Sequence, residues 1–174
     1  MYGFCGNHEW GTHPEIIKAI VKRTQCKKYL ELGIYDATTI SEIAKIVDYA
    51  VGVDCLDLRK YYNFNFIQSS TDDFFKNNTE TFDIIFIDAD HTFDSVKKDF
   101  ENALNILNKH GIIFLHDTDP MNIMLTQPGY CNNCYKIVKY IRENHKELDL
   151  INLPISEAGL TIVNRKDENR HLCY

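Results

Sequence analysis

The chain has 174 residues, of which 44% are apolar and 25% are charged, and 19 basic against 25 acidic residues give a net charge of −6. A chain of this length can bury a substantial core, so we expect residues 1–174 to form one domain. The negative charge argues against a nucleic-acid partner or an anionic membrane surface. No apolar run is long enough to span a membrane and no signal-peptide pattern opens the sequence, so we expect a cytoplasmic protein.

Short apolar runs alternate with amphipathic patterns along the first half of the chain. A capping residue followed by an early proline predicts a helix from Pro14 to about Arg23. The other elements expected here are strands at Lys28–Leu32, Tyr49–Val53 and Phe64–Gln68 and helices at Thr38–Val47 and Thr71–Asn77.

The second half shows the same alternation more clearly. Phe82–Asp88 is almost continuously apolar, which is typical of a strand covered on both faces. Apolar residues along one face predict a helix over Phe93–Asn108, and we expect Gly111 to end it. The remaining expected elements are a strand at Ile112–Leu115, a helix at Tyr135–Asn144 and strands at Leu148–Leu153 and Leu160–Asn164.

Strands that alternate with helices predict an α/β fold with a doubly wound, Rossmann-like sheet and helices on both faces. The sheet should be mostly parallel. Because no helix separates the last two strands, we expect one antiparallel strand near the C-terminus.

Acidic residues follow four of the predicted strands. They are Glu31, Asp54, the pair Asp88 and Asp90, and Asp117. The carboxyl ends of parallel strands meet at one edge of a sheet, where ligands bind in such folds. Because like charges repel, convergence of these acids predicts a ligand or a cation that offsets the repulsion.

Three segments of the sequence resemble a known family. Tyr29–Thr39 (YLELGIYDATT) resembles the first motif of class I S-adenosylmethionine-dependent methyltransferases. Phe86–His91 (FIDADH) and Gly111–Asp117 (GIIFLHD) are similar to the branch that includes bacterial small-molecule and sugar O-methyltransferases. The resemblance covers about residues 28–117. It implies an enzyme that uses S-adenosylmethionine to methylate a hydroxyl of a small molecule or sugar, and it leaves open whether the chain works as a homodimer.

The resemblance also implies cofactor-binding roles. Gly33 would let the backbone approach the methionine part of the cofactor, and Glu31 would help to hold its amino group. Asp54 would accept hydrogen bonds from the ribose hydroxyls, and Ser70 and Thr71 would lie near the adenine, although both also suit a helix cap. The full implied set is Glu31, Gly33, Ile34, Tyr35, Thr39, Asp54, Cys55, Ser70, Thr71 and Asp88.

The chain departs from the family pattern at three positions. Tyr35 and Ala37 stand where the family often has glycines, and Ser70 stands where an acid often follows the third strand. No G-x-G-x-x-G or P-loop pattern occurs, which argues against a nicotinamide oxidoreductase or a kinase.

Methyl transfer to oxygen requires alignment of the reactants and removal of a proton from the acceptor. The candidate catalytic residues are Asp88, Asp90, His91 and His116. Related enzymes hold magnesium with acids after the fourth and fifth strands, and the matching positions here are Asp88, His116 and Asp117; a histidine suits zinc, manganese or iron better. Without a metal, His91 or His116 would be the general base, and Asp90 is the alternative candidate for this role. The structural alternatives are a helix cap for His91 and a backbone hydrogen bond for His116.

Two other functions remain open: a metal-dependent hydroxylase or hydrolase on the same fold, and a non-catalytic binding subunit. Residues 1–13 and Asp119–Cys134 are candidate lids over the site. We expect Cys131 and Cys134 to be free loop thiols, since only His171 and Cys173 could complete a zinc site with them.

Overall fold

A computed structural model describes residues 12–57 and 63–167 of the chain. The strands are β1 (Lys28–Leu32), β2 (Tyr49–Asp54), β3 (Asn65–Gln68), β4 (Phe82–Ile87), β5 (Leu107–His116), β6 (Leu148–Leu153) and β7 (Leu160–Arg165). The helices are α1 (His13–Thr24), α2 (Thr38–Ile43), α3 (Thr71–Asn77), α4 (Phe93–Ile106), α5 (Lys136–Asn144) and the 3₁₀ helix η1 (Ile123–Thr126).

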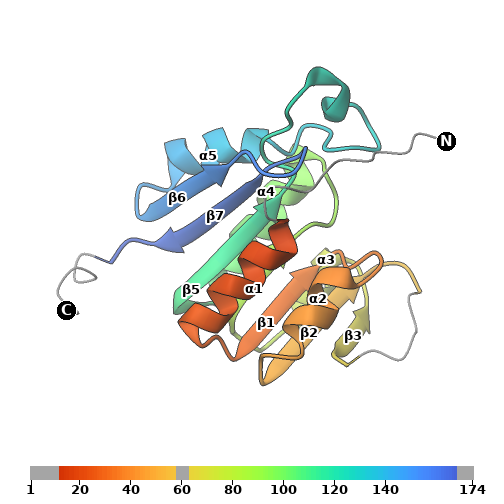
Figure 1. The fold of residues 1–174 in the computed structure, drawn as a ribbon, viewed down its shortest axis with the longest axis vertical. Helices are drawn as coiled ribbons and strands as arrows, with labels where there is room; N and C mark the ends of the chain where they lie inside the picture. Colours follow the sequence, from red (N-terminus) through yellow and green to blue (C-terminus); the bar gives the residue numbers. More distant parts are fainter. Residues whose placement is uncertain (1–11, 58–62, 168–174) are drawn as a thin grey trace.

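The strands form one sheet in the order β3-β2-β1-β4-β5-β7-β6 (Figure 1). The pairs from β3 to β5 are parallel, whereas β7 runs antiparallel to both β5 and β6. The predicted fold class is therefore confirmed, including the antiparallel strand near the C-terminus. Two neighbouring parallel strands, β1 and β4, lie at the centre and position the loops that follow them.

Alternating side chains of the strands feed two cores, one on each face of the sheet. On the first face α1 and α2 bury Ile17 and Ile40 against Tyr29 and Phe86. On the second face α3, α4 and α5 pack against the alternate residues of the same strands, such as Leu30 and Ile85 (Figure 1). This two-sided burial explains why the strands read as continuous apolar runs.

The end of α4 differs from the prediction. The helix stops at Ile106, not Asn108, and β5 begins at once, so that Gly111 lies inside the strand and does not end the helix. A Cβ at Gly111 would lie 2.8 Å from the Asp83 carbonyl oxygen, so glycine is required there by close backbone packing. The Arg165 guanidinium on β7 instead satisfies the carbonyl oxygens at the end of α4, with Nη2 donating to Leu104 O at 2.7 Å.

The second helix is also shorter than predicted. α2 ends at Ile43, not Val47, because the chain tightens into a turn in which Ile46 N donates to Ile43 O at 2.9 Å. Apart from these boundaries, the predicted helices and strands are present. No helix within the described ranges is long and apolar enough to cross a membrane.

Candidate active site

A cavity of about 980 Å³ opens at the carboxyl ends of the central strands. Its lining residues come from the loops after β1 to β5 and from the first turns of α3 and α4: Gly33, Tyr35, Val53, Asp54, Cys55, Leu56, Ser69, Ser70, Thr71, Asp72, Asp88, Ala89, Asp90, His91, Asp94, Ser95, Lys98, Asp99, His116 and Asp117. Four of the five acids predicted to converge at this edge lie in its wall; Glu31 does not. A cavity of this volume can enclose a nucleoside-sized ligand.

The turn after β1 is built by backbone contact. Gly33 has φ +80°, and a Cβ there would lie 2.1 Å from the Asp88 carbonyl oxygen, since Asp88 N donates to Leu32 O at 2.8 Å. The protein's own backbone therefore already requires glycine at this position, independently of any ligand.

Tyr35 and Ala37, which replace glycines of the family pattern, keep the backbone shape that glycine favours. Their φ angles are +40° and +60°, in the left-handed region. Tyr35 is 80% exposed at the rim of the cavity, so its ring does not fill the hollow.

Asp54 ties the turn after β1 to the end of β2. Its Oδ2 accepts hydrogen bonds from Ile34 N at 3.0 Å and Tyr35 N at 3.2 Å, and its Oδ1 accepts one from Leu56 N at 2.9 Å. A carboxylate offers about four acceptor positions, so Asp54 has room for one further donor from a ligand such as a ribose hydroxyl.

Three residues of the implied cofactor set lie outside the cavity wall. Glu31 is 2% exposed and points to the α2 face of the sheet, where it accepts hydrogen bonds from Tyr29 Oη at 2.6 Å and from the Ile40 backbone. Burial raises the pKa of Glu31 well above its usual value. Ile34 and Thr39 are buried in the same layer. Strand alternation explains the orientation of Glu31, because it shares a face with Tyr29.

The N-terminus of α3 forms the wall beyond β3. Ser70 is the N-cap, and its Oγ accepts a hydrogen bond from Asp73 N at 3.1 Å. Ser70 and Thr71 both line the cavity as well, so the capping role and a place beside a ligand are compatible.

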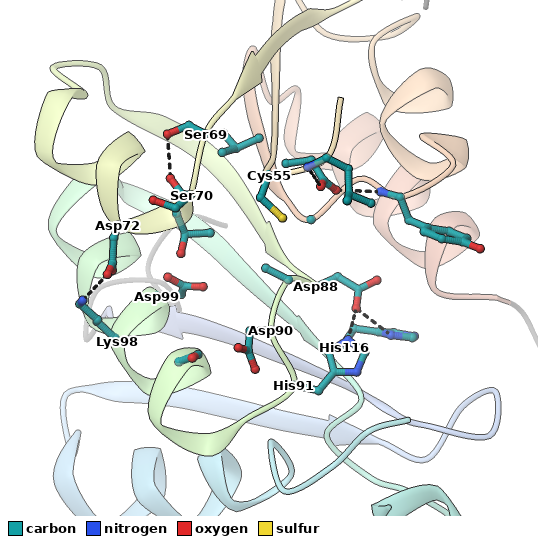
Figure 2. A pocket seen from close by; sticks show the side chains of 18 of the residues that line it. Cys55, Ser69, Ser70, Asp72, Asp88, Asp90, His91, Lys98, Asp99 and His116 are labelled. Carbon is teal, nitrogen blue, oxygen red and sulfur yellow. Dashed lines mark hydrogen bonds and ion pairs between the residues drawn. The ribbon is translucent and has the colours of Figure 1, made fainter. Parts of the chain in front are cut away.

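A compact cluster of two carboxylates and two imidazoles occupies the cavity wall after β4 and β5 (Figure 2). His116 Nδ1 lies 3.3 Å from Asp88 Oδ1 and 3.0 Å from Asp117 Oδ1. His91 Nδ1 lies 2.6 Å from the Tyr130 carbonyl oxygen and 3.1 Å from Asp117 Oδ2, while its Nε2 lies 3.6 Å from Asp88 Oδ1. The two structural alternatives are therefore wrong: Thr92 is the N-cap of α4, and His116 faces carboxylates.

The cluster favours positive charge. The hydrogen bond to Asp88 raises the pKa of His91 to about 9 against the effect of burial. Burial alone would lower the pKa of His116, but its hydrogen bonds to Asp117 and Asp88 raise it to about 10. Burial would raise the pKa of Asp88, yet the two histidines hold it well below its usual range. Two carboxylates that attract two protons are also suited to a divalent cation.

Metal-ligand geometry is present at this point. One atom each of Asp88, His116 and Asp117 lies within 4.8 Å of the others, and these are the three metal positions predicted from the resemblance. Asp90, in contrast, accepts a hydrogen bond from Thr92 N at 2.7 Å and so shapes the start of α4, although it too lines the cavity.

Sequence reasoning missed His13 and the polar face of α4. The His13 ring, in the first turn of α1, lies against that of His116 with 4.2 Å between ring centroids and an interplanar angle of 58°. Burial and the neighbouring His116 lower the pKa of His13 to about 4. Four polar residues of α4 line the cavity: Asp94, Ser95, Lys98 and Asp99. Their spacing places them on the helix face away from Phe100, and this pattern could have been recognised from the sequence.

The predicted lids are only partly described. Residues 1–11 lie outside the described ranges, whereas Thr12 and His13 begin α1. The stretch 119–134 contacts the cluster through the Tyr130 carbonyl oxygen. Within it Cys131 and Cys134 are free, as predicted, but buried, and Cys134 Sγ lies 3.0 Å from Asp117 O. His171 and Cys173 lie outside the described ranges.

The sequence matches the family described as Methyltransferase domain over residues 23–118, more than half of the chain. No curated protein matches it in sequence. Its structure is similar to the O-methyltransferase from Bacillus cereus in complex with SAH, at 16% identity and a TM-score of 0.65, covering 92% of this chain and 84% of that one. It is also similar to the SAH-bound methyltransferase PaMTH1 of Podospora anserina, at 16% identity and a TM-score of 0.71, covering 91% and 80%.

A third similar structure is the O-methyltransferase TomG from Streptomyces achromogenes in complex with SAM, at 13% identity and a TM-score of 0.64, covering 88% of this chain and 79% of that one. At such identities the likeness establishes the fold, and the sequence match establishes the family. The chain therefore belongs to the methyltransferase-domain family and has the class I methyltransferase fold that its motifs predict.

Proposed function

We propose that the chain is an S-adenosylmethionine-dependent O-methyltransferase that acts on a hydroxyl of a small molecule or sugar. The observation that carries this proposal is the cavity at the carboxyl ends of the strands, with Asp54 in one wall and the Asp88 cluster at the other end. Bound SAM or SAH in similar folds supports the same cofactor here.

The residues present fit the cofactor in part. Asp54 keeps acceptor capacity for a ribose hydroxyl, and Gly33 lines the same cavity as Asp54 and Asp88. Glu31 points away from the cavity, so we do not assign it to the methionine amino group. When bound, S-adenosylmethionine supplies an electrophilic methyl group on its sulfonium.

The cluster beside Asp88 would orient the acceptor hydroxyl, and the ionised Asp88 carboxylate would receive its proton as the methyl group is transferred. With pKa values raised to about 9 and about 10, His91 and His116 are protonated near neutral pH, which suits hydrogen-bond donation and prevents either from acting as a base. Asp88 is ionised and can accept a hydrogen bond from the acceptor hydroxyl. Alignment of the hydroxyl with the methyl group would supply most of the rate enhancement.

A divalent cation fits the same cluster. Asp88, His116 and Asp117 would hold it, and two carboxylates with one imidazole are a donor set for magnesium, manganese, zinc or iron. Such an ion would lower the pKa of a hydroxyl group bound to it. The positive charge of the cation would then balance the two carboxylates, as the protons on the histidines do when no cation is bound.

The test is calorimetric titration of the purified protein with S-adenosylhomocysteine, together with thermal unfolding. We expect saturable binding and a higher Tm, because a ligand that binds only the folded state stabilises it. Asp54→Asn should weaken binding about tenfold or more, since it removes a charged acceptor. Asp149→Asn, an exposed carboxylate on β6, is the matched control.

No heat and no rise in Tm at millimolar ligand would refute the proposed function. Repeating the titration in EDTA and again with added magnesium or manganese separates the cation from the cofactor. Binding of cation that disappears in Asp88→Asn would support the metal ligands named above; cation binding that survives this substitution would contradict them.

A further inference from the structure

Asp99 is a buried carboxylate in the cavity wall that the proposed reaction does not use. It lies on α4, is 2% exposed, and accepts a hydrogen bond from the side chain of Thr71 at the start of α3. Lys98, the neighbouring cation on α4, is paired instead with Asp72 Oδ2 at 2.6 Å (Figure 2). A carboxylate can accept about four hydrogen bonds, so Asp99 can accept from a ligand while keeping Thr71.

Its place in the cavity indicates which part of a ligand it would meet. The strand order β3-β2-β1-β4-β5 puts the Asp88 cluster and the β3 end on opposite sides of the Gly33 turn. A ligand with its reacting methyl near Asp88 and its ribose at Asp54 extends its base toward the β3 end. There the walls are the start of α3 and the cavity face of α4, where Asp99 lies near Ser70 (Figure 2) and accepts the hydrogen bond from Thr71.

We propose that Asp99 recognises the exocyclic amino group of the adenine base and so selects adenine over bases that carry a carbonyl at this position. This inference rests on the proposed function. The amino group donates hydrogen bonds, which an ionised carboxylate accepts, whereas a 6-carbonyl oxygen would face the carboxylate as a second acceptor. In the family pattern an acid often follows the third strand, where this chain has Ser70. Asp99 on α4 would supply the carboxylate in its place.

The electrostatic surroundings make the selection depend on pH. Burial raises the pKa of Asp99 to about 6, and the Thr71 hydrogen bond opposes this effect. Asp72 on α3 and Asp90 after β4 raise the pKa of Asp99 further, while Lys98 lowers it. Below pH 6 the protonated acid can donate to a carbonyl oxygen, so preference for adenine should grow as the pH rises from 5 to 8.

The experiment compares S-adenosylhomocysteine with S-inosylhomocysteine by calorimetry. Wild-type protein at pH 8 should bind the adenine ligand about 10- to 100-fold more tightly, as expected for a hydrogen bond to a buried charge. In Asp99→Asn the amide both donates and accepts, so the ratio of the two affinities should fall to near one. Asp149→Asn, an exposed carboxylate on β6 outside the cavity wall, should leave the ratio unchanged.

Each result has a distinct meaning. If Asp99→Asn lowers the affinity for both ligands equally, so that the ratio of the two affinities is unchanged, the inference is overturned and Asp99 has a structural role. If that variant does not fold, the wild-type ratio measured at pH 5 and pH 8 decides: growth with pH supports the inference and a constant ratio overturns it. Absence of wild-type binding to either ligand would refute the proposed function itself.

Discussion

Tyr35 combines an exposed side chain with a backbone conformation that favours glycine. Its φ is +40° and its side chain is 80% exposed, so little packing offsets the strain. A non-glycine residue in the left-handed region lowers the free energy of unfolding by about 1–2 kcal/mol. Glycine avoids this strain but lowers the free energy of unfolding by about 0.4–1 kcal/mol, because its unfolded chain has more conformational freedom.

Relief of this strain should be measurable. We expect Tyr35→Gly to be more stable than Tyr35→Ala by about 1 kcal/mol in urea unfolding, because both variants lose the ring and only glycine removes the strain. Equal stabilities would show that the turn after β1 relaxes around any side chain. The missing glycines at positions 35 and 37 could be recognised from the sequence, but the retained positive φ could not.

Among the elements, α4 shows why a helix end is hard to predict from its own sequence. The expected stop at Gly111 assumed that a helix ends through local backbone geometry. Here Arg165, far along the chain on β7, binds carbonyl oxygens on both sides of the junction between α4 and β5: Nη2 donates to Leu104 O in the last turn of α4, and Nη1 to Leu107 O at 3.2 Å and Asn108 O at 3.1 Å at the start of β5. A tertiary partner of this kind has no local pattern.

Removal of this cap should destabilise the fold. We expect Arg165→Met to lower the free energy of unfolding by about 2 kcal/mol, because three carbonyl oxygens lose a charged donor. Arg142→Met, an exposed arginine in the last turn of α5, should change it by about 0.5 kcal/mol or less. Chemical denaturation of both variants measures the difference, and similar values would contradict the capping role.

Some features of the site follow from the local sequence, and others depend on tertiary packing. The convergence of acids that follow several strands was predictable because parallel strands bring their carboxyl ends to one edge, and Asp54, Asp88 and Asp117 are there. The orientation of Glu31 follows from strand alternation, because it shares a face with Tyr29, and could have been read from the sequence. The contact between the His13 and His116 rings depends on how α1 packs across the sheet, so spacing in the sequence does not reveal it.

At the scale of the whole molecule, the β6–β7 pair joins the rest of the sheet through the β5–β7 ladder, and a polar contact at the end of α5 links this part of the chain to α4. His145, directly after α5, places Nε2 2.9 Å from Glu101 Oε1 on α4 and Nδ1 3.0 Å from Glu147 Oε1 before β6. Burial alone would lower the pKa of His145, but these hydrogen bonds outweigh burial and raise it above the usual value.

This contact gives global stability a predictable pH dependence. A histidine with a raised pKa in the folded state contributes stability that is fully present below its unfolded pKa of about 6.5 and is lost as the pH rises through the folded pKa. We therefore expect the free energy of unfolding to fall more between pH 6 and pH 9 in the wild type than in His145→Gln. Guanidinium titrations of both proteins across this pH range measure the difference. If His145→Gln kept the wild-type slope, the glutamates would not hold His145 in its charged form.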